Sequence, residues 1–112
     1  MTAVAVDQLA SAARAQRAHE HLALYQMVHG SEGMNRWLAI SLADGSCDQK
    51  PYATKAEAVR FQLHETQCAY LFFNGMPLLK ELRFFLDTCE ELYDAGMSLA
   101  DPNTYVNPEF IL

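Results

Sequence analysis

The chain is poor in basic side chains, and this scarcity argues against one large class of functions. Its 112 residues contain 8 Lys and Arg against 14 Asp and Glu, a formal net charge of −6. Binding to the phosphate backbone of a nucleic acid depends on clustered Lys and Arg, so general nucleic-acid binding is disfavoured. The acidic residues are also dispersed, with no run longer than Glu90–Glu91, which argues against a nucleic-acid mimic.

Cysteine is scarce as well. Cys47, Cys68 and Cys89 are an odd number at wide spacing, which excludes a disulfide framework and suits a reducing cytoplasm. Cys68 and Cys89 lie within apolar patterns and are predicted to be core thiols. Cys47 is followed by Asp48, whose charge disfavours the thiolate, so no nucleophilic cysteine is predicted.

Long apolar runs are absent. No stretch approaches the roughly 18 residues that a membrane-spanning helix needs, and the N-terminus lacks a basic region followed by an apolar one. The protein is therefore expected to be soluble, to contact no membrane and to stay in the compartment where it is made.

The histidines do not form a metal site in the expected secondary structure. His19 and His21 are two residues apart on a predicted helix and point about 200° from each other, so they are expected to be solvated together with His29. His64 and Cys68 are separated by a change of pattern, and zinc needs three or four ligands. Glycine-rich phosphate loops and nucleophile elbows are also missing. No catalytic, metal or cofactor residues are predicted, and the protein is not expected to be an enzyme.

The composition that remains is globular: 51% of the residues are hydrophobic and 20% are charged, enough for one domain over residues 1–112. Its clearest stretch is residues 51–73. Thr54 and Glu57 have the spacing of a capping box at the start of a helix. The unbroken apolar run Cys68–Phe73 then predicts a strand covered on both faces. The helix is expected to bury one apolar stripe, formed by Ala56, Val59 and Leu63.

The N-terminal region, residues 1–30, is predicted to be a long helix. It is expected to begin at Asp7 as its N-cap and to end at His29, with Gly30 as the stop. Its alanine-rich first half favours helix by propensity alone. A helix of about 34 Å is long for this domain, so it is expected to cross the whole sheet or to pack against a second copy.

Alternation along Arg36–Leu42 predicts the first strand, with Trp37 on one face and Leu38 on the other. Asp44-Gly45 is a hairpin signal, and the returning segment, residues 46–52, is expected to be a weak edge strand or an irregular arm. A last helix follows the Asn74-Gly75 turn and Pro77, and Gly96 ends it. Its apolar stripe is Leu78, Leu82, Phe85, Cys89 and Leu92.

The element order predicts an α+β fold, α-β-β-α-β-α, with helices packed on a small three-stranded mixed sheet. Residues 36–96 form the ββαβα core, and residues 97–112 form an extended C-terminal tail. The first strand is expected in the middle, antiparallel to both neighbours, because a right-handed crossover makes the second and third strands parallel. The first helix or a partner subunit is expected to cover the second face of the sheet.

The surplus of apolar surface predicts a binding protein that forms homo-oligomers. The predicted interface residues come from the first helix, the first strand and the tail: Leu22, Tyr25, Val28, Trp37, Tyr105, Phe110 and Ile111. An alternative is a nucleic-acid-associated protein that stacks bases on an aromatic sheet face formed by Trp37, Tyr70 and Phe72.

The segments RWLAISLADGSCDQKPYATKAEAVRFQLHETQCAYLFF and ELYDAGMSLADP together resemble a group of small uncharacterised proteins encoded by bacteriophages of actinobacteria. The shared pattern is W-x-A-I-x-L-x-D-G-x-x-D, a tyrosine, then T-K-A-x-A-V-R-x-Q, and it covers about residues 36–102. The resemblance implies a phage accessory protein that works in the cytoplasm of the host cell or is carried in the virion. It implies a host or phage protein as partner and no catalytic residues.

Overall fold

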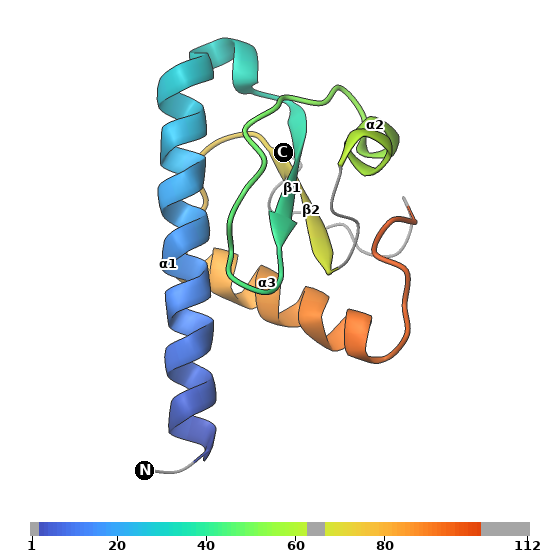
Figure 1. The fold of residues 1–112 in the computed structure, drawn as a ribbon. Coiled ribbons are helices and arrows are strands. Elements are labelled where there is room, and N and C mark those ends of the chain that lie inside the picture. Colours follow the sequence, from blue (N-terminus) through green and yellow to red (C-terminus); the bar gives the residue numbers. More distant parts are fainter. Residues whose placement is uncertain (1–2, 63–66, 102–112) are drawn as a thin grey trace.

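The structure is a computed structural model that describes residues 3–62 and 67–101 (Figure 1). It confirms a mixed α+β architecture. The described elements, in chain order, are α1 (Ala3–His29), the 3-10 helix η1 (Gly30–Gly33), β1 (Arg36–Ser41), α2 (Lys55–Phe61), β2 (Cys68–Phe73) and α3 (Leu79–Asp94). Figure 1 shows α1 standing along one side of the sheet, α3 crossing beneath it and α2 on the far side.

The sheet has two strands in the described part of the chain, so the predicted three-stranded sheet is wrong. β1 and β2 pair antiparallel, in a register from Arg36↔Phe73 to Ser41↔Cys68. The segment of residues 46–52, which we call the arm, makes only two isolated antiparallel bridges with β1. β1 therefore lies between β2 and the arm, as predicted for its position. The arm takes the irregular form, which is one of the two forms predicted for residues 46–52.

The arm fails to form a strand because it holds more residues than β1 can pair. Its bridges are Trp37↔Tyr52 and Ile40↔Cys47, so two residues separate the partners on β1 and four separate them on the arm. The side chain of Asp48 accepts a hydrogen bond from the backbone N–H of Lys50 (3.1 Å), which turns the chain locally. Pro51 follows and has no N–H to give to a ladder.

Both faces of β2 are covered, as its unbroken apolar sequence predicted. Leu71 and Phe73 belong to the main core, which α1 and α3 complete from one side of the sheet. Tyr70 points to the other side and packs with Ala39, Tyr52 and Ala58 in a second, smaller cluster. α2 supplies part of this second layer, and Trp37 and Phe72 stay half-buried on the same face.

α1 is longer than predicted. It begins at Ala3, which makes the assignment of Asp7 as its N-cap wrong: the alanine-rich segment before Asp7 continues the helix. Its end at His29 is confirmed, and Gly30 follows with a φ of 56°, a conformation that glycine adopts without strain. The first turns of α1 extend beyond α3 in Figure 1.

The start of α2 is confirmed at Thr54. The hydroxyl of Thr54 accepts a hydrogen bond from the backbone N–H of Glu57 (3.1 Å), whereas the Glu57 carboxylate accepts from Ala53 (3.3 Å), one residue earlier than in the predicted box. The predicted stripe is confirmed in part: Val59 is half-buried and packs on the inner side of α2, but Ala56 is exposed, and the fully buried residues of α2 are Lys55 and Ala58. The third member of the predicted stripe, Leu63, lies outside the described residues.

α3 matches its prediction closely. Leu82, Phe85 and Cys89 are all buried in the main core, and their spacing of three and four places them on one face. Leu78 is the N-cap and is exposed, so the buried stripe begins one turn later than predicted.

Candidate functional site

Two of the predicted interface residues lie inside the chain. Leu22 and Tyr25 are fully buried against the sheet, and the hydroxyl of Tyr25 donates a hydrogen bond to the backbone carbonyl of Gly33 (2.7 Å). Neither side chain offers surface to a partner. Val28 is 64% exposed and Trp37 is half-buried, so both reach the surface. The remaining predicted interface residues, Tyr105, Phe110 and Ile111, lie outside the described residues.

The spacing along α1 explains why Leu22 and Tyr25 face inward. Ala15, Ala18, Leu22 and Tyr25 repeat at intervals of three and four, and all four are buried. The two alanines bring the backbone of α1 close to its neighbours, and the two large residues fill the core. The sequence contains this stripe, but the other apolar residues around Leu22 lie on several faces of α1. The sequence alone therefore does not distinguish the buried face of the helix.

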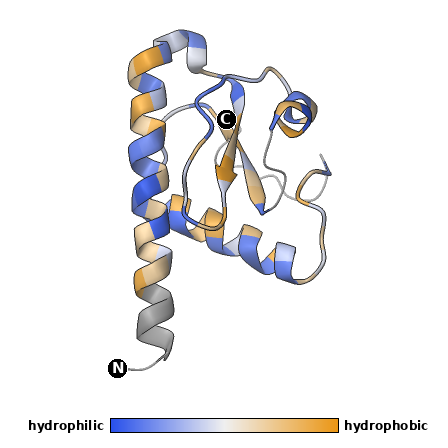
Figure 2. Cartoon of the chain, viewed as in Figure 1, coloured by the Kyte–Doolittle hydropathy of each residue, from blue (hydrophilic) through white to orange (hydrophobic). Residues whose placement is uncertain are grey.

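The opposite side of α1, which we call the outer face, carries more exposed large apolar residues than any other described element. Leu9 is 62% exposed, Leu24 44%, Met27 76% and Val28 64%. Three of these four lie in the last two turns of α1, where Figure 2 shows strongly apolar residues above a hydrophilic middle section. We define the outer face as Leu9, Ala10, Ala13, Arg17, Glu20, Leu24, Met27 and Val28.

A groove runs along part of the outer face. It has a volume of about 380 Å³ and lies between α1 and the turn that follows β1. Ala10 and Ala13 form its apolar wall, while Arg17, Glu20 and Asp44 supply charges. A hydrogen bond from the backbone of Ser46 (2.9 Å) chiefly lowers the pKa of Asp44, and Arg17 adds a smaller electrostatic contribution. The groove is thus bordered by both signs of charge.

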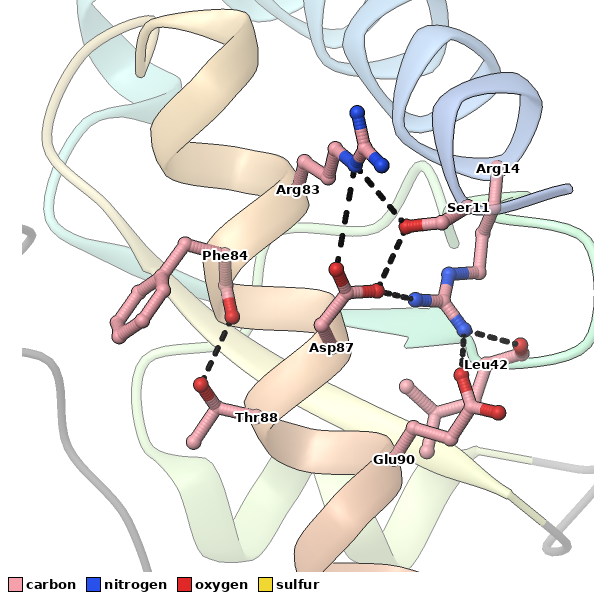
Figure 3. A network of polar contacts seen from close by, with 8 residues as sticks. All are labelled: Ser11, Arg14, Leu42, Arg83, Phe84, Asp87, Thr88 and Glu90. Atoms are coloured by element: carbon pink, nitrogen blue, oxygen red, sulfur yellow. Dashed lines mark hydrogen bonds and ion pairs between the residues drawn. The ribbon is translucent and has the colours of Figure 1, made fainter. Parts of the chain in front are cut away.

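The inner side of the same helix is fastened to α3 by a polar network (Figure 3). The guanidinium of Arg14 is 7% exposed and donates to the carboxylates of Asp87 and Glu90, and also to the backbone carbonyl of Leu42 (3.4 Å). Ser11 donates to Asp87 (2.7 Å). These charges are engaged within the chain, so the network holds α1 against α3.

The aromatic sheet face is only partly exposed. Trp37 and Phe72 are register partners and pack edge to face, with ring centroids 5.3 Å apart. Tyr70 lies on the same face but is 9% exposed, because α2 covers it and the amine of Lys55 lies 5.9 Å from its ring centroid. The three aromatic residues therefore share a face as predicted, but only Trp37 and Phe72 can reach a ligand.

Burial holds two of the thiols in their protonated form. It raises the pKa of Cys47 to about 12, with a further increase from Asp48, and it raises the pKa of Cys89 to about 12. Because the thiolate is the nucleophile and the metal ligand, neither side chain is activated near neutral pH.

Two histidines that were expected to be solvated instead hold the arm. His21 Nδ1 accepts a hydrogen bond from the backbone N–H of Cys47 (3.2 Å), and His29 Nε2 donates to the carbonyl of Gln49 (2.9 Å). The amide of Gln49 donates in turn to the carbonyl of His21 (3.1 Å). Sequence reasoning missed this role because the hairpin brings the arm to α1 only in the folded chain.

Further observations concern membranes, metals and known proteins. Among residues 3–62 and 67–101, no helix combines the length and apolarity that crossing a bilayer requires. The same residues contain no cluster of three or more His, Cys, Asp or Glu side chains arranged to hold a metal ion. Comparisons of the chain with protein-family models, curated proteins and solved structures give no match.

Proposed function

We propose that the chain is a small non-catalytic binding protein that acts through protein–protein contact and forms a homo-oligomer through the outer face of α1. The observation that carries the proposal is the exposure of Leu9, Leu24, Met27 and Val28 on one side of one helix. Large apolar side chains gathered on an exposed surface mark interaction sites. A twofold dimer is the commonest arrangement that buries the same surface of both copies.

The engagement of the chemically versatile side chains supports a non-catalytic role. The Cys47 and Cys89 thiols are buried and protonated. His21 and His29 are bonded to the backbone of the arm, and the amine of Lys55 donates to the carbonyl of Asp101. Each of these groups is buried or hydrogen-bonded within the chain and so contributes to the stability of the fold. This arrangement favours a protein whose fold supports a binding surface.

The resemblance to actinobacteriophage proteins supports an accessory role in a phage, in the host cytoplasm or in the virion. The resembling region, about residues 36–102, contains the sheet, α2 and α3. α1 precedes it and carries the outer face. In this proposal the sheet and its two helices form the platform, and α1 supplies the contact with a partner.

The second candidate is association with single-stranded nucleic acid through Trp37 and Phe72. Their half-buried rings on one sheet face favour it, because bases stack on aromatic side chains. The net charge of −6 opposes it. A gel shift at low and high salt separates the two functions: salt-sensitive retardation that Trp37→Ala abolishes would support nucleic-acid binding.

The protein-binding proposal is tested by light scattering on three proteins at micromolar concentration. Met27→Glu places a charge in the exposed apolar patch and is expected to reduce the mass from dimer to monomer. Gln26→Glu is the matched control, because Gln26 is exposed on the same helix but lies outside the outer face. Equal masses for the wild-type chain and Met27→Glu would overturn self-association through this face.

A further inference from the structure

We infer that a second copy of this chain occupies the outer face, with its α1 antiparallel to the α1 of the first copy. A twofold axis relates the two copies and passes beside the point midway between Ala18 and His19. The inference rests on the proposed function and adds the register and the contacts. Figure 1 shows that α1 lies at the edge of the fold along its whole length, with the sheet and α3 on one side of it. A second helix can therefore approach the outer face along this edge.

The charges of the outer face are self-complementary only in this orientation. Arg17 and Glu20 are both exposed and lie at equal distances on either side of the midpoint. An antiparallel pair places Arg17 opposite Glu20 of the partner subunit, and the twofold axis repeats the contact in the reverse sense. A parallel pair in register would place Arg17 opposite Arg17 of the partner subunit, and like charges disfavour that arrangement.

The apolar residues match in the same register. Ala13 and Leu24 are also equidistant from the midpoint, so Ala13 faces Leu24 of the partner subunit. On the flanks, Ala10 lies level with Met27 of the partner subunit, and Leu9 lies level with Val28 of the partner subunit. Large residues therefore pack against small ones near the centre, which lets two helices approach closely.

The groove has the position that this register requires. Ala10 and Ala13 line its apolar wall, and these are the residues that lie level with Met27 and Leu24 of the partner subunit. Each copy thus carries both the groove and the large side chains that fill it. The contact from Leu9 to Val28 spans about 29 Å of helix, at 1.5 Å per residue. Reciprocal fit along this length favours a second copy over a foreign helix.

Charge reversal on the two central residues tests the register. Arg17→Glu alone leaves two acidic pairs across the twofold axis, and Glu20→Arg alone leaves two basic pairs. Each variant is expected to dimerise roughly 10- to 100-fold more weakly than the wild-type chain. In an equal mixture, each central residue of one variant meets an opposite charge on the other. The mixture is therefore expected to form a heterodimer, seen by native mass spectrometry with one variant isotope-labelled.

A control is needed because Arg17 also acts on Asp44 within its own chain. Asp44→Ala removes that intrachain partner, and its melting temperature measures what the intrachain contact contributes to the fold. Because Asp44 also lines the groove, the control for dimerisation is Gln26→Glu, which lies outside the outer face and is expected to leave the dimer unchanged. Circular dichroism and melting temperature establish that each variant is folded. If both reversed variants dimerise as the wild-type chain does, or if their mixture gives no heterodimer, the register is overturned while self-association stands. A monomeric wild-type chain would overturn both.

Discussion

The contact of Arg14 with two carboxylates predicts an order of stabilities among the wild-type chain and three variants. The Arg14 side chain is 7% exposed, whereas the side chains of Asp87 and Glu90 are 41% and 51% exposed. The cation therefore depends on its partners more than they depend on it. The Nε atom of Arg14 is buried and has no hydrogen-bond partner in the structure, so its desolvation is only partly compensated.

Arg14→Met removes the buried charge and leaves two carboxylates that water can reach again. This change is expected to reduce the free energy of unfolding by about 1–2 kcal/mol, since half-exposed ion pairs contribute little. Asp87→Ala with Glu90→Ala leaves the guanidinium buried without a counter-charge. That double variant is expected to lose about 3–5 kcal/mol. The triple variant, with all three changes, is expected to be more stable than the double variant.

Urea denaturation of the wild-type chain and the three variants measures these free energies, with Glu91→Ala as an exposed control on the same helix. The midpoints should fall in the order wild type, Arg14→Met, triple variant and double variant, with the triple variant close to Arg14→Met. A triple variant less stable than the double variant would refute the reasoning, because it would show that the Arg14 charge still stabilises the fold without its two partners.

Other predictions concern the core, a helix cap and alkaline pH. Phe85 is 2% exposed, so Phe85→Ala should cost about 3–5 kcal/mol and lower the melting temperature; an unchanged value would place α3 elsewhere. Thr54→Ala should cost about 1 kcal/mol in denaturant, because the N–H of Glu57 loses its acceptor, and an unmoved midpoint would contradict that cap. Burial raises the pKa of Cys47 from 9.0, and of Tyr25 from 10.0, to about 12 in each case. As the pH rises, the unfolded chain therefore releases these protons at a lower pH than the folded chain does. The free energy of unfolding should be constant below pH 9 and fall between pH 9 and 12. A free energy of unfolding that stays constant between pH 9 and 12 would contradict the burial of these groups.

The elements that depend on local pattern could be predicted from the sequence. The bounds of β2 and the end of α1 at His29 agree with the structure. The N-cap at Thr54 was also found, because capping depends on residues close in sequence. α3 showed the clearest periodicity, and three of its five stripe residues, Leu82, Phe85 and Cys89, are buried.

The errors occurred where a long-range contact outweighed the local pattern. The three-stranded sheet is wrong because the arm, predicted as either a weak edge strand or an irregular segment, takes the irregular form. The Asp48 turn and the hydrogen bonds with His21 and His29 hold it there. Leu22 and Tyr25 looked like interface residues because the position of the sheet against α1 was unknown. The groove along the outer face depends on the turn after β1, and no pattern within α1 alone predicts it.

The central claim is that two copies of this chain associate through the outer faces of their first helices. The most direct measurement is sedimentation equilibrium of the wild-type chain over a range of micromolar concentrations at low and moderate salt. We predict a mass that rises with concentration toward about 25 kDa, twice the 12.6 kDa of one chain, with weaker association at higher salt because two exposed ion pairs contribute. A mass of 12.6 kDa at every concentration would contradict the claim.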